Sequence, residues 1–179
     1  MEYMLKTIAK SGIDGALFKA QLYRYLNEPE ESESICQDIL AADPDNQAAL
    51  RLLGLAITDQ FHGTALDRYA EVETAFQHLS DPYKKEYYFG ILWERRAKAQ
   101  ARAGRPSHVW APLFEEAMKH FEAAEQIKPT DNEEAVLRWN RCVRLLQTIP
   151  TISHEESASL QDDDTAPLEF ARRSVKAPH

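Results

Sequence analysis

The sequence AMKHFEAAEQIKP, residues 117–129, shows the clearest helical pattern in the chain. Ala117, Phe121 and Ala124 follow one another at steps of four and three residues, so they share one face of an α-helix. Pro129 comes directly after this face and predicts the end of the helix, because proline cannot continue a helix interior. A single helix cannot bury such a face alone, so the stretch predicts a helix packed against a partner.

The same spacing extends through most of the chain. Apolar residues recur at helical steps from Ile13 to Leu146, and no segment has the two-residue alternation of a half-buried strand. Proline, glycine and capping residues between these segments mark helix ends and starts. Seven helices are predicted, near residues 14–26, 29–42, 46–61, 64–79, 82–103, 110–127 and 132–147. The short turns between them predict antiparallel neighbours.

Both ends of the chain differ from this helical region. In residues 1–12 the spacing of Met4, Leu5 and Ile8 suits a short helix, but a frayed terminus fits equally well. The helical domain is expected over residues 13–149. Residues 150–179 are rich in Ser, Asp, Glu, Thr and Pro, which predicts a tail that is disordered or loosely docked. Within this tail, residues 167–173 suit either a docking motif or a strap returning to the helices, and an inert tail is the simpler interpretation.

Composition narrows the range of functions. The chain has 179 residues and a formal net charge of −8, with 21 Lys and Arg against 29 Asp and Glu. This balance argues against binding to nucleic acid or to an acidic membrane. The two cysteines, Cys36 and Cys142, lack the spacing of a zinc or redox motif and are expected to be small buried residues in a cytoplasmic protein. No stretch is long and apolar enough to span a bilayer.

The helices repeat as pairs whose landmarks match a known order: a large residue, Leu-Gly and Tyr in a first helix, then Ala, Phe and Pro in a second, over roughly 34 residues. The first pair places Ala20, Tyr23, Ser32, Cys36 and Pro44 in this order. The second places Leu50, Leu53, Gly54 and Ile57 before Leu66, Tyr69, Ala70, Phe76 and Pro82. The third has Phe89, Gly90 and Trp93 before Ala117, Phe121, Ala124 and Pro129. Over residues 13–147 the chain therefore resembles the tetratricopeptide repeat (TPR) family.

This resemblance implies an all-α, right-handed superhelix of about three helix pairs, followed by one C-terminal capping helix. Trp139 occupies the small-residue position of the last helix, which suits a cap. The spacings from Pro44 to Pro82 and from Pro82 to Pro129 exceed the family period. We therefore expect added residues in the connections near 61–64 and 104–112.

The resemblance also implies a function, because such proteins bind a partner protein on the concave side lined by the first helices. A peptide or helix of a partner protein is the expected ligand, and a homodimer is the alternative. The candidate partner-binding residues are Gln21, Arg24, Arg51, Leu55, Thr58, Tyr87, Ile91, Glu94, Arg95, Val136 and Asn140. For any one of these positions, an ordinary solvated helix face is the simpler interpretation.

Charged and aromatic residues offer further candidates. Arg95, Lys98, Arg102 and Arg105 recur at steps of three or four residues, so they share a helix face that suits an acidic peptide or, more simply, pairs with Glu115, Glu116 and Glu122. The carboxylate clamp of some TPR proteins is not expected, because Leu17, Gln21 and Leu52 occupy its positions. Among the aromatic residues, Phe89 and Trp93 are expected to face inward, and Tyr83 and Tyr87 to lie on the surface.

Catalysis is not expected from the sequence. The six histidines form no paired motif such as H-E-x-x-H, and no nucleophile lies beside a base in a recognisable pattern. We therefore predict no catalytic residues, no cofactor and no metal. An enzyme or small-ligand binder is the third and weakest alternative.

Overall fold

The computed structural model describes residues 3–149, and the predictions for the tail from residue 150 lie outside them. Seven α-helices follow a 3-10 turn at Lys10–Gly12. The helices are α1 (Ile13–Tyr25), α2 (Pro29–Ala42), α3 (Gln47–Asp59), α4 (Tyr69–Gln77), α5 (Pro82–Arg102), α6 (Ser107–Gln126) and α7 (Glu134–Leu146). No strand occurs among the described residues. The prediction of an all-α fold with seven helices is confirmed.

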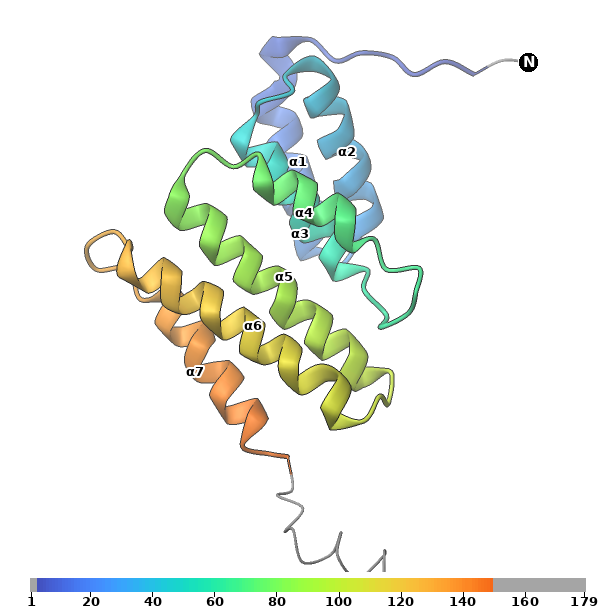
Figure 1. The fold of residues 1–179 in the computed structure, drawn as a ribbon. Coiled ribbons are helices and arrows are strands. Elements are labelled where there is room, and N and C mark those ends of the chain that lie inside the picture. The colour runs from blue at the N-terminus through green and yellow to red at the C-terminus, as the bar shows by residue number, and fades with distance from the viewer. Residues whose placement is uncertain (1–2, 150–179) are drawn as a thin grey trace, which may run out of the picture. The chain divides into compact units, whose positions relative to one another are not determined.

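Consecutive helices pack against one another along the whole series (Figure 1). Each helix turns back on the preceding one, as the short connections predict. Contacts also link helices two apart in the chain, namely α1 with α3 and α3 with α5. All seven helices lie in one compact unit, Met1–Thr148. The odd-numbered helices are thus neighbours in space as well as partners of the even-numbered ones.

Several helix starts follow from their capping residues. The Asn46 side chain accepts a hydrogen bond from the Ala49 backbone N–H at 3.0 Å and caps α3. The Asp81 carboxylate accepts one from the Tyr83 N–H at 3.0 Å at the start of α5. These bonds satisfy N–H groups that have no partner within the helix. Pro29 and Pro82 occupy the first turns of α2 and α5, where no backbone N–H is needed.

The predicted start of the fourth helix at residue 64 is wrong, because α4 begins at Tyr69. Residues 61–68 form a loop around Asp67, whose carboxylate accepts hydrogen bonds from the backbone N–H groups of His62, at 2.9 Å, and Gly63, at 2.7 Å. Partial burial opposes the charge of Asp67, but these bonds and the Tyr69 hydroxyl lower its pKa. The expected lengthening near 61–64 is therefore a loop built on one carboxylate.

The expected lengthening near 104–112 has another origin. The helix predicted to start at residue 110 begins at Ser107 and contains Pro112, and only residues 103–106 separate it from α5. The additional residues extend the two helices, which contain 21 and 20 residues. At the N-terminus, residues 3–9 have no regular structure, so the short helix considered there is absent from this described part.

One packing contact recurs in the core between each odd-numbered helix and the even-numbered helix that follows. Gly54 of α3 lies against the Phe76 ring of α4, and Gly90 of α5 lies against the Phe121 ring of α6. A Cβ atom on Gly90 would lie only 2.5 Å from Phe121 Cε1, so the close approach requires glycine there. In the first hairpin, Ala20 of α1 and Cys36 of α2 are fully buried in one cluster. The small residue lies on the odd-numbered helix each time.

Candidate basic site on the odd-numbered helices

A chain of ion pairs links the odd-numbered helices. Asp59 of α3 lies between two guanidinium groups, with its carboxylate oxygens 2.6 Å from Arg24 Nε of α1 and 2.5 Å from Arg95 Nη1 of α5. Glu94, the residue before Arg95, pairs with Lys98 one turn later and with Arg138 Nη1 of α7 at 3.4 Å. The charges therefore alternate across α1, α3, α5 and α7.

Arg95 is held by several groups of α3. Besides Asp59, its guanidinium donates to the Leu55 carbonyl at 3.0 Å and to the Thr58 hydroxyl at 2.5 Å. Burial lowers the pKa of Arg95, while the Asp59 carboxylate favours its charged form. These contacts hold the Arg95 side chain in one orientation against α3.

Glu94 lies beneath the surface of the site, because its side chain is 0% exposed. A buried carboxylate needs paired cations to offset the loss of its hydration, and Lys98 and Arg138 provide them. Burial opposes the charge of Arg138, but Glu94 and the Tyr87 phenol raise its pKa. Burial of Cys142, together with the Glu94 charge, raises the pKa of its thiol to about 12. Of Glu94 and its two partners, only Lys98 and Arg138 reach the surface.

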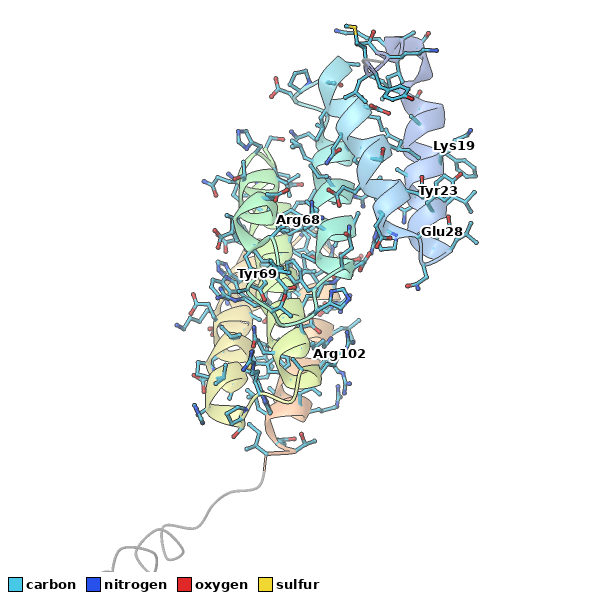
Figure 2. All side chains as sticks on the ribbon, turned by 90° about the vertical axis from the view of Figure 1, so that its right-hand side faces the viewer. Lys19, Tyr23, Glu28, Arg68, Tyr69 and Arg102 are labelled. Atoms are coloured by element: carbon cyan, nitrogen blue, oxygen red, sulfur yellow. The ribbon has the colours of Figure 1, made fainter. Side chains whose placement is uncertain are left out.

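These residues border a pocket of about 250 Å³, which we call the basic pocket. Its lining consists of Thr58, Asp59, Phe61, Arg95, Lys98, Arg102 and Arg138. Figure 2 shows Arg102 near the C-terminal end of α5. Arg102 has no ion-pair partner within 4.0 Å among residues 3–149. The pocket thus combines positioned cations with one whose charge is not neutralised by a described neighbour.

A second pocket, of about 320 Å³, shares Lys98 and Arg102 with the basic pocket. We call it the apolar pocket. It is lined by Lys98, Ala101, Arg102, Trp110, Phe114, Arg141, Leu145 and Thr148. The Trp110 indole N–H donates to the Arg105 carbonyl at 3.0 Å, and its ring meets Phe114 edge to face. An apolar surface between α5, α6 and α7 therefore adjoins the cationic one.

Four of the ten main partner-binding candidates are buried, namely Thr58, Tyr87, Ile91 and Glu94. The prediction that they present surface side chains is wrong. Tyr87, Ile91 and Glu94 lie on α5, which packs against α3, α4 and α6 and also contacts α7, and Thr58 lies on α3, which contacts α1, α2, α4 and α5. The half-buried candidates are Gln21, Arg24, Leu55, Arg95, Val136 and Asn140. Arg51 is half-buried as well, but it lines a different pocket with Gln47 and Lys84. The basic pocket thus contains only Thr58 and Arg95 of the predicted set.

Asp59 and Arg138 were missed by sequence reasoning. Asp59 directly follows Thr58 and lies four residues after Leu55, so helical spacing indicates that it lies next to these two candidates. Arg138 precedes Arg141 by three residues on one helix, and this basic spacing is the sequence signal that indicates it. Arg95, Lys98 and Arg102 of the basic strip lie on α5, but Arg105 lies beyond the end of this helix, in the connection to α6. The expected pairing of the strip with Glu115, Glu116 and Glu122 is wrong, because Arg95 and Lys98 pair with Asp59 and Glu94.

The aromatic prediction was also partly wrong. Tyr83 and Tyr87 are buried, at 7% and 9% exposure, and their rings stack with centroids 5.9 Å apart. The Tyr83 hydroxyl donates to the Asn132 side chain at 2.9 Å, in the connection to α7. Phe89 and Trp93 are half-buried against the core, as expected. Cys36 and Cys142 are fully buried, which confirms that prediction.

Arg68, at the start of α4, forms a separate polar cluster (Figure 2). Its guanidinium donates two hydrogen bonds to Glu33 of α2, each 2.6 Å long. These bonds lower the pKa of Glu33, against the effect of burial. The cluster connects α2 with the 61–68 loop and lies outside the basic pocket.

No group of three or more His, Cys, Asp and Glu side chains within residues 3–149 is arranged to hold a metal ion. Within the same residues, no helix combines the length and apolar character needed to cross a membrane. Comparisons with protein-family models, curated proteins and solved structures found no match to this chain.

Proposed function

We propose that the chain is a protein-binding module that holds an acidic segment of a partner protein on its odd-numbered helices. The observation that carries this proposal is the basic pocket. It brings together four cations, Arg95, Lys98, Arg102 and Arg138, whose acidic partners among the described residues are Asp59 and Glu94. This local positive excess occurs in a chain with a net charge of −8, so it is not a consequence of composition.

We further propose that the helices form a TPR-like right-handed superhelix of three pairs with α7 as the cap. The contacts of α1 with α3 and of α3 with α5 support this arrangement. The recurring small residue on each odd-numbered helix supports a repeated hairpin. In such a superhelix the first helices of the pairs line one continuous face. The ion-pair chain from Arg24 to Arg138 would then lie along this face.

The two adjoining pockets define the chemistry of the ligand. Carboxylates of a partner fit the basic pocket, where Arg side chains offer paired N–H donors. A large apolar side chain next to them fits the apolar pocket beside Trp110 and Leu145. A segment in which two or three Asp or Glu residues adjoin a Leu or Phe satisfies both. Because Lys98 and Arg102 line both pockets, the acidic and the apolar residues of the ligand would have to be adjacent.

The test is fluorescence polarisation with a labelled peptide of this kind, at low salt. Arg102→Glu is the informative variant, because Arg102 is exposed and its loss leaves no described acidic residue without its partner. We expect its Kd to rise at least tenfold, since a hydrogen bond to a charged group contributes about 1.5–3 kcal/mol. Arg144→Glu is the matched control, with the same charge change at an exposed position of α7 that lines neither pocket.

Two further peptides separate specific binding from simple attraction of charge. Replacing Glu by Gln and Asp by Asn should abolish binding, and replacing the apolar residue by Ser should weaken it. Inorganic phosphate is the competing probe for a small-anion site. Displacement of the peptide by phosphate at a concentration near 1 mM, or equal Kd values for the Arg102→Glu and Arg144→Glu variants, would reject the proposal.

A further inference from the structure

Exposed apolar side chains gather at one end of the helical unit. Residues 3–149 include twelve large apolar residues with exposed side chains, and seven of these lie within the first 26 residues. They are Tyr3, Met4, Leu5, Phe18, Leu22, Tyr25 and Leu26. Scattered apolar residues are normal on a protein surface, but a concentration in one region indicates a contact surface.

Four of these residues form a stripe along α1. Phe18, Leu22 and Tyr25 follow one another at steps of four and three residues, and Leu26 adjoins them, so all four share one side of the helix. Phe18 is 70% and Tyr25 is 77% exposed. Figure 2 shows Lys19, the neighbour of Phe18, on the side of α1 that faces away from the other helices. We call these four residues the α1 stripe.

The opposite side of α1 already has its partners. Ile13 and Ala20 are buried in the core, and Leu17 packs against the same clusters. The helix is therefore apolar on two sides and covered on only one. A terminal helix of a stack that ends in water normally has a polar outer face. At the other end the exposed side of α7 is mixed, since Arg141 and Arg144 lie there beside Leu137.

From this asymmetry we infer that the α1 stripe and the N-terminal arm, residues 3–9, form an interface between two copies of the chain. A two-fold contact at α1 buries the apolar end of both copies and leaves the two charged α7 ends in water, which closes the assembly at two. A head-to-tail contact would instead place the apolar stripe against the arginines of α7 and would continue without end. The chemistry of the two ends therefore favours the two-fold pair.

The available area suits such a pair. From the exposed fractions of its side chains, the α1 stripe offers roughly 500 Å² per chain, taking about 200 Å² for a fully exposed large side chain. Tyr3, Met4 and Leu5 of the N-terminal arm add a similar area. Two copies together would bury about 2,000 Å², at the upper end of the standard range of about 1,200–2,000 Å² for stable interfaces. The stripe alone would give only about half of this, so the arm is part of the proposed interface.

This inference does not depend on the proposed function, because the stripe and the arm share no residue with the basic pocket or the apolar pocket. Peptide binding at α5 can fail while the chain still dimerises, and the reverse also holds. The two proposals are therefore tested by separate measurements.

The first measurement is the mass of the full chain by light scattering coupled to size-exclusion chromatography, from about 1 to 200 μM. We expect twice the chain mass of 20.5 kDa at the upper concentrations. The variant Phe18→Glu with Tyr25→Glu should remain at 20.5 kDa throughout, because each copy would then bring two negative charges to the contact. Both side chains are exposed, so the melting temperature of the monomer should change little.

The matched control is Leu66→Glu with Leu137→Glu, which adds the same two negative charges in place of apolar side chains that are 89% and 66% exposed outside the α1 stripe. This variant should dimerise like the unmodified chain. A wild-type mass of 20.5 kDa at 200 μM would overturn the inference. Dissociation of the control to the same extent as the stripe variant would overturn it as well, because the contact would then not be specific to α1.

A cross-linking experiment locates the contact directly. Leu22 lies in the middle of the α1 stripe, so Leu22→Cys places two thiols near the two-fold axis. The native Cys36 and Cys142 are 0% exposed and should not react with a short bis-maleimide reagent. We expect a covalent dimer for Leu22→Cys and only monomer for the control Leu137→Cys. Equal dimer yields from both variants would contradict an interface at α1.

Discussion

Glu94 shows how one buried charge can organise the helices around it. Its carboxylate is 0% exposed and pairs with Lys98 of the same helix and Arg138 of α7. An ion pair of this kind contributes little net stability compared with a well-packed apolar group. Its effect is to fix the positions of two cations at the edge of the basic pocket. Stability and site geometry are therefore coupled at this residue.

We predict that Glu94→Ala lowers the free energy of unfolding by about 3 kcal/mol, because it leaves two cations without their counter-charge and creates a cavity. Urea unfolding monitored by circular dichroism measures this loss. Glu115→Ala, an exposed glutamate of α6, is the control and should change stability by less than about 0.5 kcal/mol. A loss below about 1 kcal/mol for Glu94→Ala would mean that Glu94 is not an essential counter-charge.

The burial of Tyr87 and Ile91 marks the limit of sequence reasoning at this scale. Helical spacing shows which residues share a face, and it grouped these two correctly on one helix. It does not show how many neighbours surround that helix. Because α5 packs against several helices, more of its circumference is buried than a two-sided amphipathic helix would bury.

Among the helices and their connections, the two stretches that are longer than the expected period have different structures. Between α3 and α4 the additional residues form the loop held by the Asp67 carboxylate. Between α5 and α6 they lengthen both helices. Proline spacing revealed the excess length in each case but not its form. The hydrogen bonds to Asp67 join residues only three to five apart, a loop motif that hydrophobic periodicity does not detect.

Gly63 and Gly104 provide a matched pair for testing the first of these connections. Both have a positive φ, 75° and 73°, so alanine is strained to a similar degree at either position. A Cβ atom on Gly63 would also lie 2.5 Å from the Ala99 carbonyl oxygen of α5, whereas nothing lies within 4 Å of one on Gly104.

We therefore predict that Gly104→Ala lowers the free energy of unfolding by about 1 kcal/mol. Gly63→Ala should lower it by a further 2 kcal/mol or more, roughly, because of the clash with α5. Thermal unfolding and urea unfolding of both variants measure the difference. Equal losses would show that the loop moves away from α5 without cost. In that case the loop would not be fixed by its contact with Ala99, and the hydrogen bonds of Asp67 would be the main constraint on it.

For the whole molecule, helix number and order were predictable because each helix has its own apolar spacing, and proline, glycine or polar residues separate it from the next. The basic pocket was not, because it depends on how α3, α5 and α7 meet. Arg95 and Thr58 were recognised individually, but only the packed structure brings Asp59, Lys98 and Arg138 to them. The exposed α1 stripe was also not recognised, since its residues follow the same helical spacing as a buried face.

Hydrogen exchange can test how the helices act together. In a linear stack each helix is stabilised by its neighbours, so the ends open first. We predict that backbone N–H groups of α5 exchange slowest, because α5 has packed neighbours on several sides, and that those of α1 and α7 exchange faster in dilute solution.

Binding of the acidic peptide should slow exchange in α3, α5 and α7 more than in α2 and α4. Raising the protein concentration should slow exchange in α1, because the proposed dimer covers it. Uniform exchange in all helices would instead indicate a single cooperative unit, and slowing confined to α2 and α4 would place the peptide on the opposite side of the stack.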